Sequence, residues 1–198
     1  MSFFSKSLFI KLVASLIILS TTSYAAQANP ILQEKKEVLK QASNFAQAVA
    51  CYTTFTGDAQ TTIEDVYLVE SSDGYAEYFV FWSGDWSCWG GASTYRSYLT
   101  SFSKLADNRP FIVDKQDILA DINADGYLIN DRFIKDVKYE KGKFFITGSD
   151  FSNIESDFEG NNLPINRYQY TLAKVDSNDE TKWALLDKKF IGKNKRDN

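Results

Sequence analysis

The chain has 198 residues, of which 44% are hydrophobic and 24% are charged, and its net charge at neutral pH is -4. This composition is typical of one ordinary globular domain and excludes a disordered chain, a collagen and a coiled coil. Histidine is absent, which excludes His-based catalytic dyads and triads, His metal ligands and His pH switches. The 15 Phe, 11 Tyr and 4 Trp residues favour β-structure.

The first 28 residues have the pattern of a secretory signal peptide. Lys6 and Lys11 provide a charged start, residues 12–20 form an apolar run, and small residues suited to cleavage follow at Ser23, Ala25, Ala26 and Ala28. The apolar run is short for a membrane span of about 20 residues, so we expect cleavage rather than anchoring. We therefore predict a periplasmic or secreted protein without a membrane span.

Removal of this segment makes the chain more acidic. The segment contains two lysines and no acidic residue, so the 22 basic residues fall to 20 against 26 acidic ones, a net charge of -6. Such a chain does not attract a phosphate backbone, and we do not expect nucleic acid as a partner. The basic end, residues 191–198, is predicted to be a flexible tail.

Residues 31–50 are predicted to form an amphipathic helix, because apolar side chains recur there at three- and four-residue steps. Cys51 falls at the end of this helix, and Cys88 is the only other cysteine. In an exported protein, two cysteines favour a disulfide over a reactive thiol, which here would lack a histidine to activate it. We predict that the disulfide ties the helix to the loop after the second strand.

After the helix, hydrophobic residues recur with a period of two, which indicates strands. Residues 63–70 and 75–82 flank Asp73-Gly74, a strong hairpin signal, and the second of these strands is apolar on both faces and therefore central. Residues 111–119 are ambiguous, and residues 149–166 have the composition of a long polar loop. Further strands are predicted at residues 95–104, 133–139, 143–147, 167–175 and 182–190, and the last four are predicted to form two hairpins.

These elements predict an α+β fold, in which the N-terminal amphipathic helix packs on a mainly antiparallel sheet of about 6–8 strands built from hairpins. No linker rich in Pro, Gly or Ser interrupts residues 29–190, so we expect a single domain there. We expect the protein to be a monomer.

The densest unusual segment, residues 82–91, combines three Trp and three Gly residues with Asp85 and Cys88. Closely spaced indole rings can form a platform for sugars, peptides or side chains of a partner. In the alternative interpretation, Asp85 caps a turn and the Trp side chains cover the end of a small core. The candidate binding residues are Trp82, Asp85, Trp86 and Trp89. We expect Trp82 to be buried, Trp86 to be the more exposed of the other two, and Trp89 to pack near the disulfide.

The same stretch resembles a Gly-Asp-x-x-Cys-x-Gly-Gly-Ser-Gly-Thr motif found in small exported proteobacterial proteins of unknown function. Ala92 and Ser93 depart from that motif, and the matching residues are Gly84, Asp85, Cys88, Gly90, Gly91 and Thr94. The resemblance covers residues 63–190 in outline. It implies export and a β-rich C-terminal half, and it implies no particular chemistry.

Residues 121–131 begin like a calcium-binding loop, since Asp121, Asn123 and Asp125 offer oxygens at positions 1, 3 and 5, with a glycine at position 6. Position 12 should be a bidentate Glu, but it is Arg132. Asn, Asp and Gly also form ordinary turns without a metal. We therefore predict that the protein has no cofactor, with calcium at this loop as a weak alternative.

Histidine-free catalysis is conceivable but poorly supported. Paired carboxylates can hydrolyse glycosides, yet the acidic residues here are scattered and no pair is fixed by the pattern. A Ser-x-x-Lys pattern occurs at Ser101 and Lys104, but on a predicted strand, whereas that chemistry requires the Ser to open a helix. We predict no catalytic residues.

The composition and the Trp segment together predict an exported, non-enzymatic protein-binding module, such as an inhibitor or an immunity protein. An acidic net charge and exposed aromatic residues suit a basic partner protein. Two alternatives stay open. The first is an envelope- or glycan-binding module that uses the Trp/Gly loop, and the second is a carboxylate-dependent hydrolase.

Overall fold

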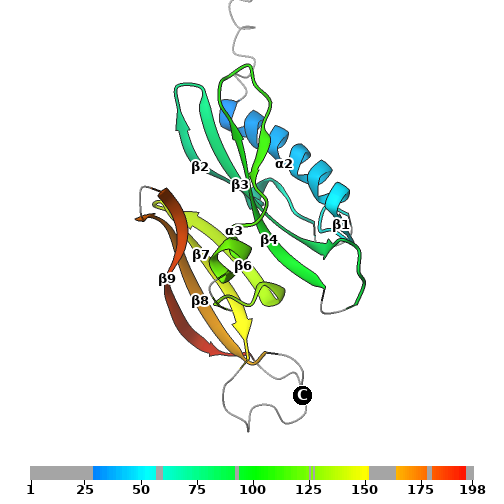
Figure 1. Cartoon of the computed structure of the whole chain (residues 1–198), viewed down its shortest axis with the longest axis vertical. Coiled ribbons are helices and arrows are strands. Elements are labelled where there is room, and N and C mark those ends of the chain that lie inside the picture. Colours follow the sequence, from blue (N-terminus) through cyan, green and yellow to red (C-terminus); the bar gives the residue numbers. More distant parts are fainter. Residues whose placement is uncertain are drawn as a thin grey trace, which may run out of the picture. The chain divides into compact units, whose positions relative to one another are not determined.

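The computed structural model describes residues 29–56, 60–91, 94–124, 126, 128–151, 164–177 and 180–194. The chain divides into two compact units, residues 1–34 and 35–198, and both β-sheets belong to the second (Figure 1). The predicted signal peptide, residues 1–28, lies outside the described residues. In the part of the chain that the structure describes, no helix combines the length and the hydropathy that crossing a bilayer requires.

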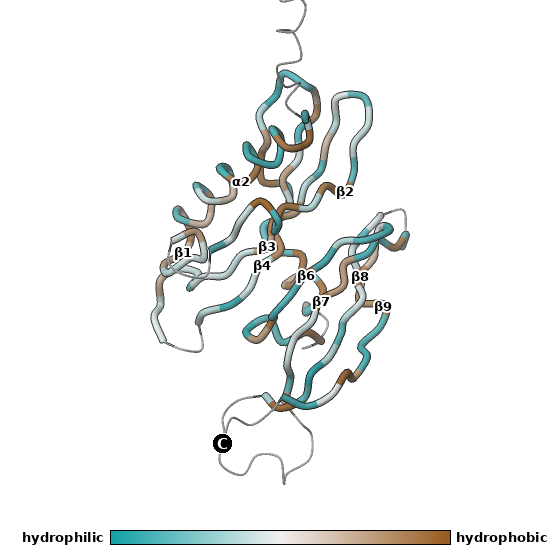
Figure 2. The backbone as a smooth tube through the Cα atoms, turned by 180° about the vertical axis from the view of Figure 1, so that it is seen from behind, coloured by the Kyte–Doolittle hydropathy of each residue, from teal (hydrophilic) through white to brown (hydrophobic). Residues whose placement is uncertain are grey.

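Helix α2 (Pro30–Val49) confirms the predicted amphipathic helix, displaced by one residue. Pro30 occupies the first position, where a helix does not need the missing N–H. Its buried residues, Val38, Ala42 and Ala46, follow one another at four-residue steps and so form a single stripe. Along the helix, hydrophilic and hydrophobic segments alternate from turn to turn (Figure 2).

The first sheet has five strands, which are β1 (Ala50–Cys51), β2 (Val66–Ser72), β3 (Tyr75–Trp86), β4 (Tyr95–Lys104) and β5 (Ile112–Lys115). β3 is central, with β4 along one edge and with β2 and β1 sharing the other. The predicted hairpin between β2 and β3 is confirmed. Asp73 and Gly74 both have positive φ, 40° and 86°, as a tight two-residue hairpin turn requires.

Alternate side chains of β3 enter two different cores. Tyr78 and Val80 are buried with Val38 and Ala42 of α2, which confirms that the helix packs on the sheet. On the opposite face, Phe79 belongs to the core shared with the second sheet. The strand is therefore central and apolar on both faces, as its sequence predicts.

The second sheet contains four antiparallel strands in chain order, β6 (Ile134–Glu140), β7 (Lys143–Asp150), β8 (Asn166–Ser177) and β9 (Glu180–Lys193). Both predicted hairpins are confirmed, whereas most of the predicted loop at residues 149–166 lies outside the described residues. β9 extends to Lys193, three residues into the segment predicted to be a tail.

The prediction of one sheet with about 6–8 strands is wrong in detail, since the described residues form nine strands in two sheets. Between β5 and β6 the chain forms α3 (Ile118–Asn123) and the short 3-10 helix η3 (Asp131–Phe133), so β6 starts a new sheet. The ambiguous residues 111–119 contain β5 and the start of α3. Helix α3 begins after Asp117, whose side chain accepts the backbone N–H groups of Leu119 and Ala120.

The two sheets share one large apolar core. Phe79 and Leu99 of the first sheet pack with α3 and with side chains of the second sheet, among them Phe144, Tyr170, Leu172 and Trp183. Hydrogen bonds also cross this interface. The Tyr67 hydroxyl donates to the Val137 carbonyl oxygen at 2.8 Å, and Lys174 Nζ donates to Glu77 Oε2 at 2.8 Å.

Candidate functional site

A disulfide between Cys51 and Cys88 joins β1 to the turn that follows β3, with the two Cα atoms 5.0 Å apart. This confirms the predicted disulfide, which connects the residue after the end of the helix to the Trp segment. A disulfide indicates an oxidising compartment. The turn is sharp, because Ser87 and Cys88 both have positive φ, 62° and 57°. The Ser87 N–H also donates to the Val49 carbonyl oxygen at 2.8 Å, so the end of α2 holds the turn as well.

Asp85 has the structural role that the sequence offered as one interpretation. Its side chain is buried, and Oδ2 accepts the Gly90 N–H at 2.7 Å across the turn. This bond and the disulfide span the same short segment, so the position of Trp89 is fixed from both sides.

The Trp residues of this segment differ widely in exposure. Trp82 is 1% exposed, stacks on Tyr98 with ring centroids 4.5 Å apart, and donates from Nε1 to Thr100 Oγ1 at 2.8 Å, which confirms its expected burial. Trp86 is half-buried, and Trp89 is 81% exposed. The expectation that Trp86 would be the more exposed of the two is therefore wrong.

The reason for this reversal is the length of β3. Trp86 is the last residue of the strand and lies on the same face as Trp82, where its ring contacts Phe45 of α2 at 6.0 Å between centroids. Trp89 follows the turn and belongs to no strand. It therefore does not pack near the disulfide as predicted, but projects from the surface.

A recess of about 480 Å³ opens beside Trp86 and Trp89. A neighbouring recess of about 500 Å³ shares Trp86, Tyr98, Asp117 and Ala120 with it, so the two are parts of one surface hollow. We call this hollow the Trp recess. Its remaining lining residues are Ser87, Thr94, Arg96, Asp131, Lys115, Gln116 and Asp121. The volume of each part falls within the range of small-ligand sites.

Four segments that are distant in the sequence meet at the Trp recess. The end of β3 supplies Trp86, the start of β4 supplies Arg96 and Tyr98, the start of α3 supplies Asp117, and η3 supplies Asp131. The last four residues were not identified from the sequence, because no local motif links them. One signal was present for Asp117, which immediately precedes the apolar residues of α3, the usual place of a helix cap.

Burial raises the pKa of two carboxylates of the Trp recess, those of Asp117 and Asp131. Asp117 accepts the N–H groups of Leu99 at 3.1 Å, Leu119 at 3.0 Å and Ala120 at 3.2 Å. Burial nevertheless raises the pKa of Asp117 to about 7, because it outweighs these three bonds, and the charge of Asp131 raises this pKa further.

Asp131 is the most deeply placed charge of the recess. Its side chain is 8% exposed, and burial raises its pKa, whereas the charge of Arg96 lowers it. Oδ2 lies 3.4 Å from Arg96 Nη1, and Oδ1 has no hydrogen-bond partner among the described residues. Burial, followed by the charge of Asp117, raises the pKa of the Tyr98 hydroxyl to about 12, so Tyr98 remains neutral at physiological pH.

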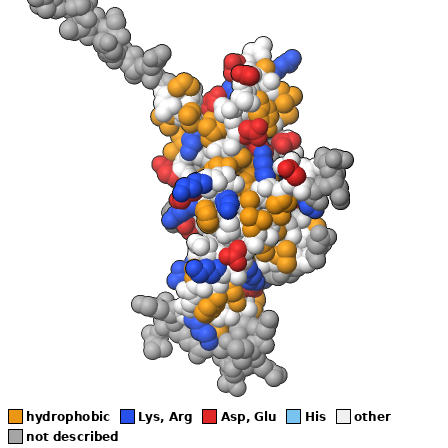
Figure 3. Space-filling view, turned by 90° about the vertical axis from the view of Figure 1, so that its left-hand side faces the viewer, with side chains coloured by type: hydrophobic (Ala, Val, Ile, Leu, Met, Phe, Trp, Pro, Cys, Tyr) orange, Lys and Arg blue, Asp and Glu red, His pale blue; other side chains and the backbone are white. Residues whose placement is uncertain are grey.

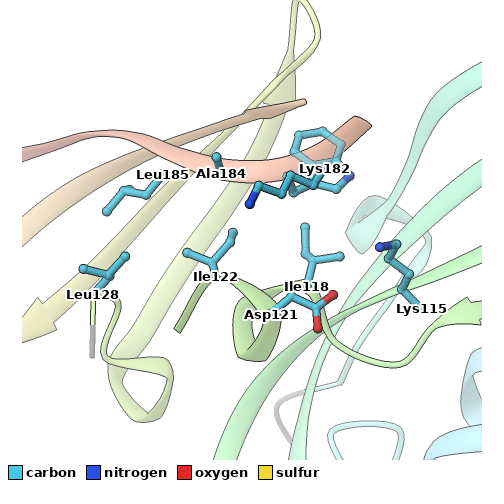
Figure 4. A pocket seen from close by; sticks show the side chains of 9 residues that line it. Lys115, Ile118, Asp121, Ile122, Leu128, Lys182, Ala184 and Leu185 are labelled. Atoms are coloured by element: carbon cyan, nitrogen blue, oxygen red, sulfur yellow. The ribbon is translucent and has the colours of Figure 1, made fainter. Parts of the chain in front are cut away.

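The calcium-like loop begins inside α3. Asp121 projects from this helix beside Ile118, at a groove of about 230 Å³ between α3 and β9 (Figure 4). Asn123 Oδ1 accepts the N–H groups of Leu128 and Ile129 at 3.1 and 2.9 Å, so the Asn123 side chain closes an ordinary turn. Asp125 lies outside the described residues.

Within the described ranges, no group of three or more Cys, Asp or Glu side chains is placed to hold a metal ion. Calcium at this loop stays the weak alternative to the predicted absence of a cofactor, and a titration monitored by Trp fluorescence tests it.

No family model, curated protein or solved structure matches this chain. The resemblance of residues 84–94 to a motif of exported proteins therefore stays a prediction. The proposed function below is therefore based on the geometry of the Trp recess.

Proposed function

We propose that this protein is an exported, non-enzymatic binding module that holds a partner protein at the Trp recess. The observation that carries this proposal is the position of Trp89, whose side chain is 81% exposed at the border of a hollow. A large apolar ring left in water beside a concave surface is the arrangement found at binding hot spots, where Trp is enriched.

The Trp loop is held in place before any partner arrives. Three links constrain residues 87–90. They are the disulfide, the hydrogen bond from the Gly90 N–H to Asp85 and the hydrogen bond from the Ser87 N–H to the Val49 carbonyl oxygen. A constrained loop loses little conformational freedom on binding, so more of the contact energy contributes to affinity. The same disulfide is consistent with a periplasmic or secreted protein.

Charge favours a basic partner. The chain without its predicted signal peptide carries a net charge of -6. On the face shown in Figure 3, basic and acidic side chains are interspersed among hydrophobic ones. Because charges of both signs are mixed on this face, it presents no large surface of one sign. Selectivity for a basic partner therefore depends on particular acidic groups, such as those that line the Trp recess.

A glycan- or envelope-binding module is the second candidate, because half-exposed indole rings beside polar side chains also stack on sugars. The carboxylate-dependent hydrolase has less support. Both oxygens of Asp117 accept backbone N–H groups, Oδ1 from Leu99 and Leu119 and Oδ2 from Ala120. That arrangement is the one expected of a helix cap.

Photo-crosslinking in cells that export the protein tests the proposal. A benzophenone amino acid replaces Trp89 in one variant and Leu105, which is 75% exposed after the opposite end of β4, in a control. We expect one protein adduct that is specific to position 89, identified by mass spectrometry. A carbohydrate adduct at position 89 would support the second candidate, and equal protein adducts at both positions would contradict a specific site.

A further inference from the structure

We infer that the Trp recess receives the side chain of a lysine from the partner, with its aliphatic stem on the indole rings and its ammonium group at Asp131. This inference rests on the proposed function, because it specifies which group of a partner protein the recess takes. It goes beyond that function by assigning a charge and a binding subsite.

The charged side chains of the Trp recess are unequal in number. Asp117, Asp131 and Arg96 line the part that adjoins Trp89, and the neighbouring part adds Asp121 and Lys115, so acidic residues outnumber basic ones by three to two. The Arg96 side chain is 48% exposed, so water screens its charge, whereas Asp131 is 8% exposed. The charges of Arg96 and of the neighbouring Arg132 both lower the pKa of Asp131, but burial outweighs them and the pKa stays raised, so these cations compensate the carboxylate incompletely.

Asp131 is also incompletely hydrogen-bonded. A buried carboxylate normally accepts several short, charge-assisted bonds. Here the contact from Oδ2 to Arg96 Nη1 is long, at 3.4 Å, and Oδ1 has no partner in the described part of the chain. An ammonium group that enters the recess beside Asp131 supplies both the missing donors and the missing charge.

Three aromatic side chains, Trp86, Trp89 and Tyr98, line the Trp recess. Trp86 and Tyr98 adjoin at 5.5 Å between ring centroids, and the exposed Trp89 borders the same hollow. The faces of such rings attract a cation, and their apolar surface accommodates the methylene stem of a lysine. In the described residues, the cation–π contacts are made by other rings, which are Phe111, Phe133, Tyr168 and Tyr170.

Calorimetric titration of the full chain tests the inference with two matched probes, Nα-acetyl-lysine N-methylamide and Nα-acetyl-norleucine N-methylamide. The second probe keeps most of the stem and lacks the ammonium group. We expect the lysine probe to bind at least about tenfold more tightly, the ratio that a desolvated cation–π contact and a charge-assisted bond together support. Equal affinities would overturn the inference.

Variants locate the effect. Asp131→Asn removes one negative charge from the recess and should abolish most of the preference for lysine. Asp187→Asn removes the same charge from an exposed position in β9 and should leave the preference unchanged.

Because Asp131 is buried, its variant can fail to fold. Trp89→Ala, at an exposed position, then provides the second measurement, and we expect it to weaken lysine binding several-fold. An unchanged preference in a folded Asp131→Asn variant, or in Trp89→Ala, would also overturn the inference.

A second pair of probes, glucosamine and N-acetylglucosamine, identifies the source of the ammonium group. Glucosamine that binds more tightly than the lysine probe would assign the recess to an amino sugar and overturn the lysine assignment. A protein adduct at position 89 combined with equal affinities for the lysine and norleucine probes would leave the proposed function intact and remove only this inference. A preference for lysine without any protein adduct would instead contradict the proposed partner.

Discussion

At the scale of single residues, the position of a side chain in its strand or turn decides its role more than its type. Trp82 and Trp86 lie on one face of β3. The Trp82 ring packs against the rings of Tyr98, Phe45 and Phe55. Trp89, only three residues after the end of the strand, projects into water. These indoles therefore make different contributions, one to the core and one to the proposed binding surface.

Trp82→Ala should lower the free energy of unfolding by about 3–5 kcal/mol, because it leaves a cavity and removes the hydrogen bond that Thr100 Oγ1 accepts. Trp89→Ala should change the same free energy by less than about 0.5 kcal/mol, since the side chain buries little. Urea unfolding followed by circular dichroism measures both. Similar losses for the two variants would show that Trp89 covers a core after all.

Asp117 should make stability depend on pH. Its pKa in the folded protein is about 7, above the usual value of an aspartate in an unfolded chain, so the folded state binds the extra proton between these two values. The contribution of Asp117 to the free energy of unfolding is therefore fully present below about pH 4, and it is lost as the pH rises to about 7.

Asn in place of Asp117 keeps a capping oxygen and does not titrate. The difference in unfolding free energy between the native chain and Asp117→Asn should therefore change steadily, to the disadvantage of the native chain, from about pH 4 to about pH 7 and then level off. Chemical unfolding of both chains across this window measures it. A difference that stays constant with pH would contradict the raised pKa.

At the scale of elements, the disulfide connects the end of α2, through β1, to the turn after β3. Its two cysteines are 37 residues apart in the sequence, and the closed loop contains β2 and the whole of β3. A crosslink of that span restricts the unfolded chain and also fixes the border of the Trp recess. The bridge thus links stability to the geometry of the site.

Replacing both Cys51 and Cys88 by Ser should lower the free energy of unfolding by about 3–4 kcal/mol, the value of the chain-entropy model for such a loop. Denaturant unfolding measures the loss. The reduced native chain serves as the control and should match the double variant. If the reduced chain is as stable as the oxidised one, the bridge contributes nothing to the fold.

At the scale of the second unit, residues 35–198, the two sheets depend on each other. Their shared core is largely aromatic, with Phe79, Phe144 and Trp183 in mutual contact at 5.0–5.5 Å between ring centroids. Lys174 of β8 also reaches Glu77 of β3, whose side chain is 7% exposed, at 2.8 Å. Bonding to Glu77 raises the pKa of Lys174 against the opposing effect of burial.

Lys174→Met should destabilise the protein by about 2 kcal/mol, because it leaves the buried Glu77 carboxylate without its cation. The loss is smaller than for a fully buried pair, since Lys174 remains one-third exposed and its charge is screened. The double variant Lys174→Met/Glu77→Gln should recover part of this loss, as thermal unfolding can show. A double variant less stable than Lys174→Met would contradict this account of the pair.

Much of the fold could be predicted because its signals are local. The stripe of α2, the Asp73-Gly74 turn, the two-sided apolar pattern of β3 and the hairpins of the second sheet each occupy a short window of sequence. The division into two sheets has no such window. It depends on the segment between β5 and β6, where a cap at Asp117 starts a helix and ends the pairing of the first sheet.

Periodicity and composition act over a few neighbouring residues, and they were enough to predict most of the elements, the pairing of the two cysteines and an unusual Trp segment. The exposure of each Trp, and the residues that surround it, depend instead on packing between distant segments. Arg96, Tyr98, Asp117 and Asp131 meet at the Trp recess because strand register and helix packing bring distant segments together. The burial of Asp117 and Asp131 and the incomplete hydrogen bonding of Asp131 arise from that meeting, and no single segment of sequence predicts them.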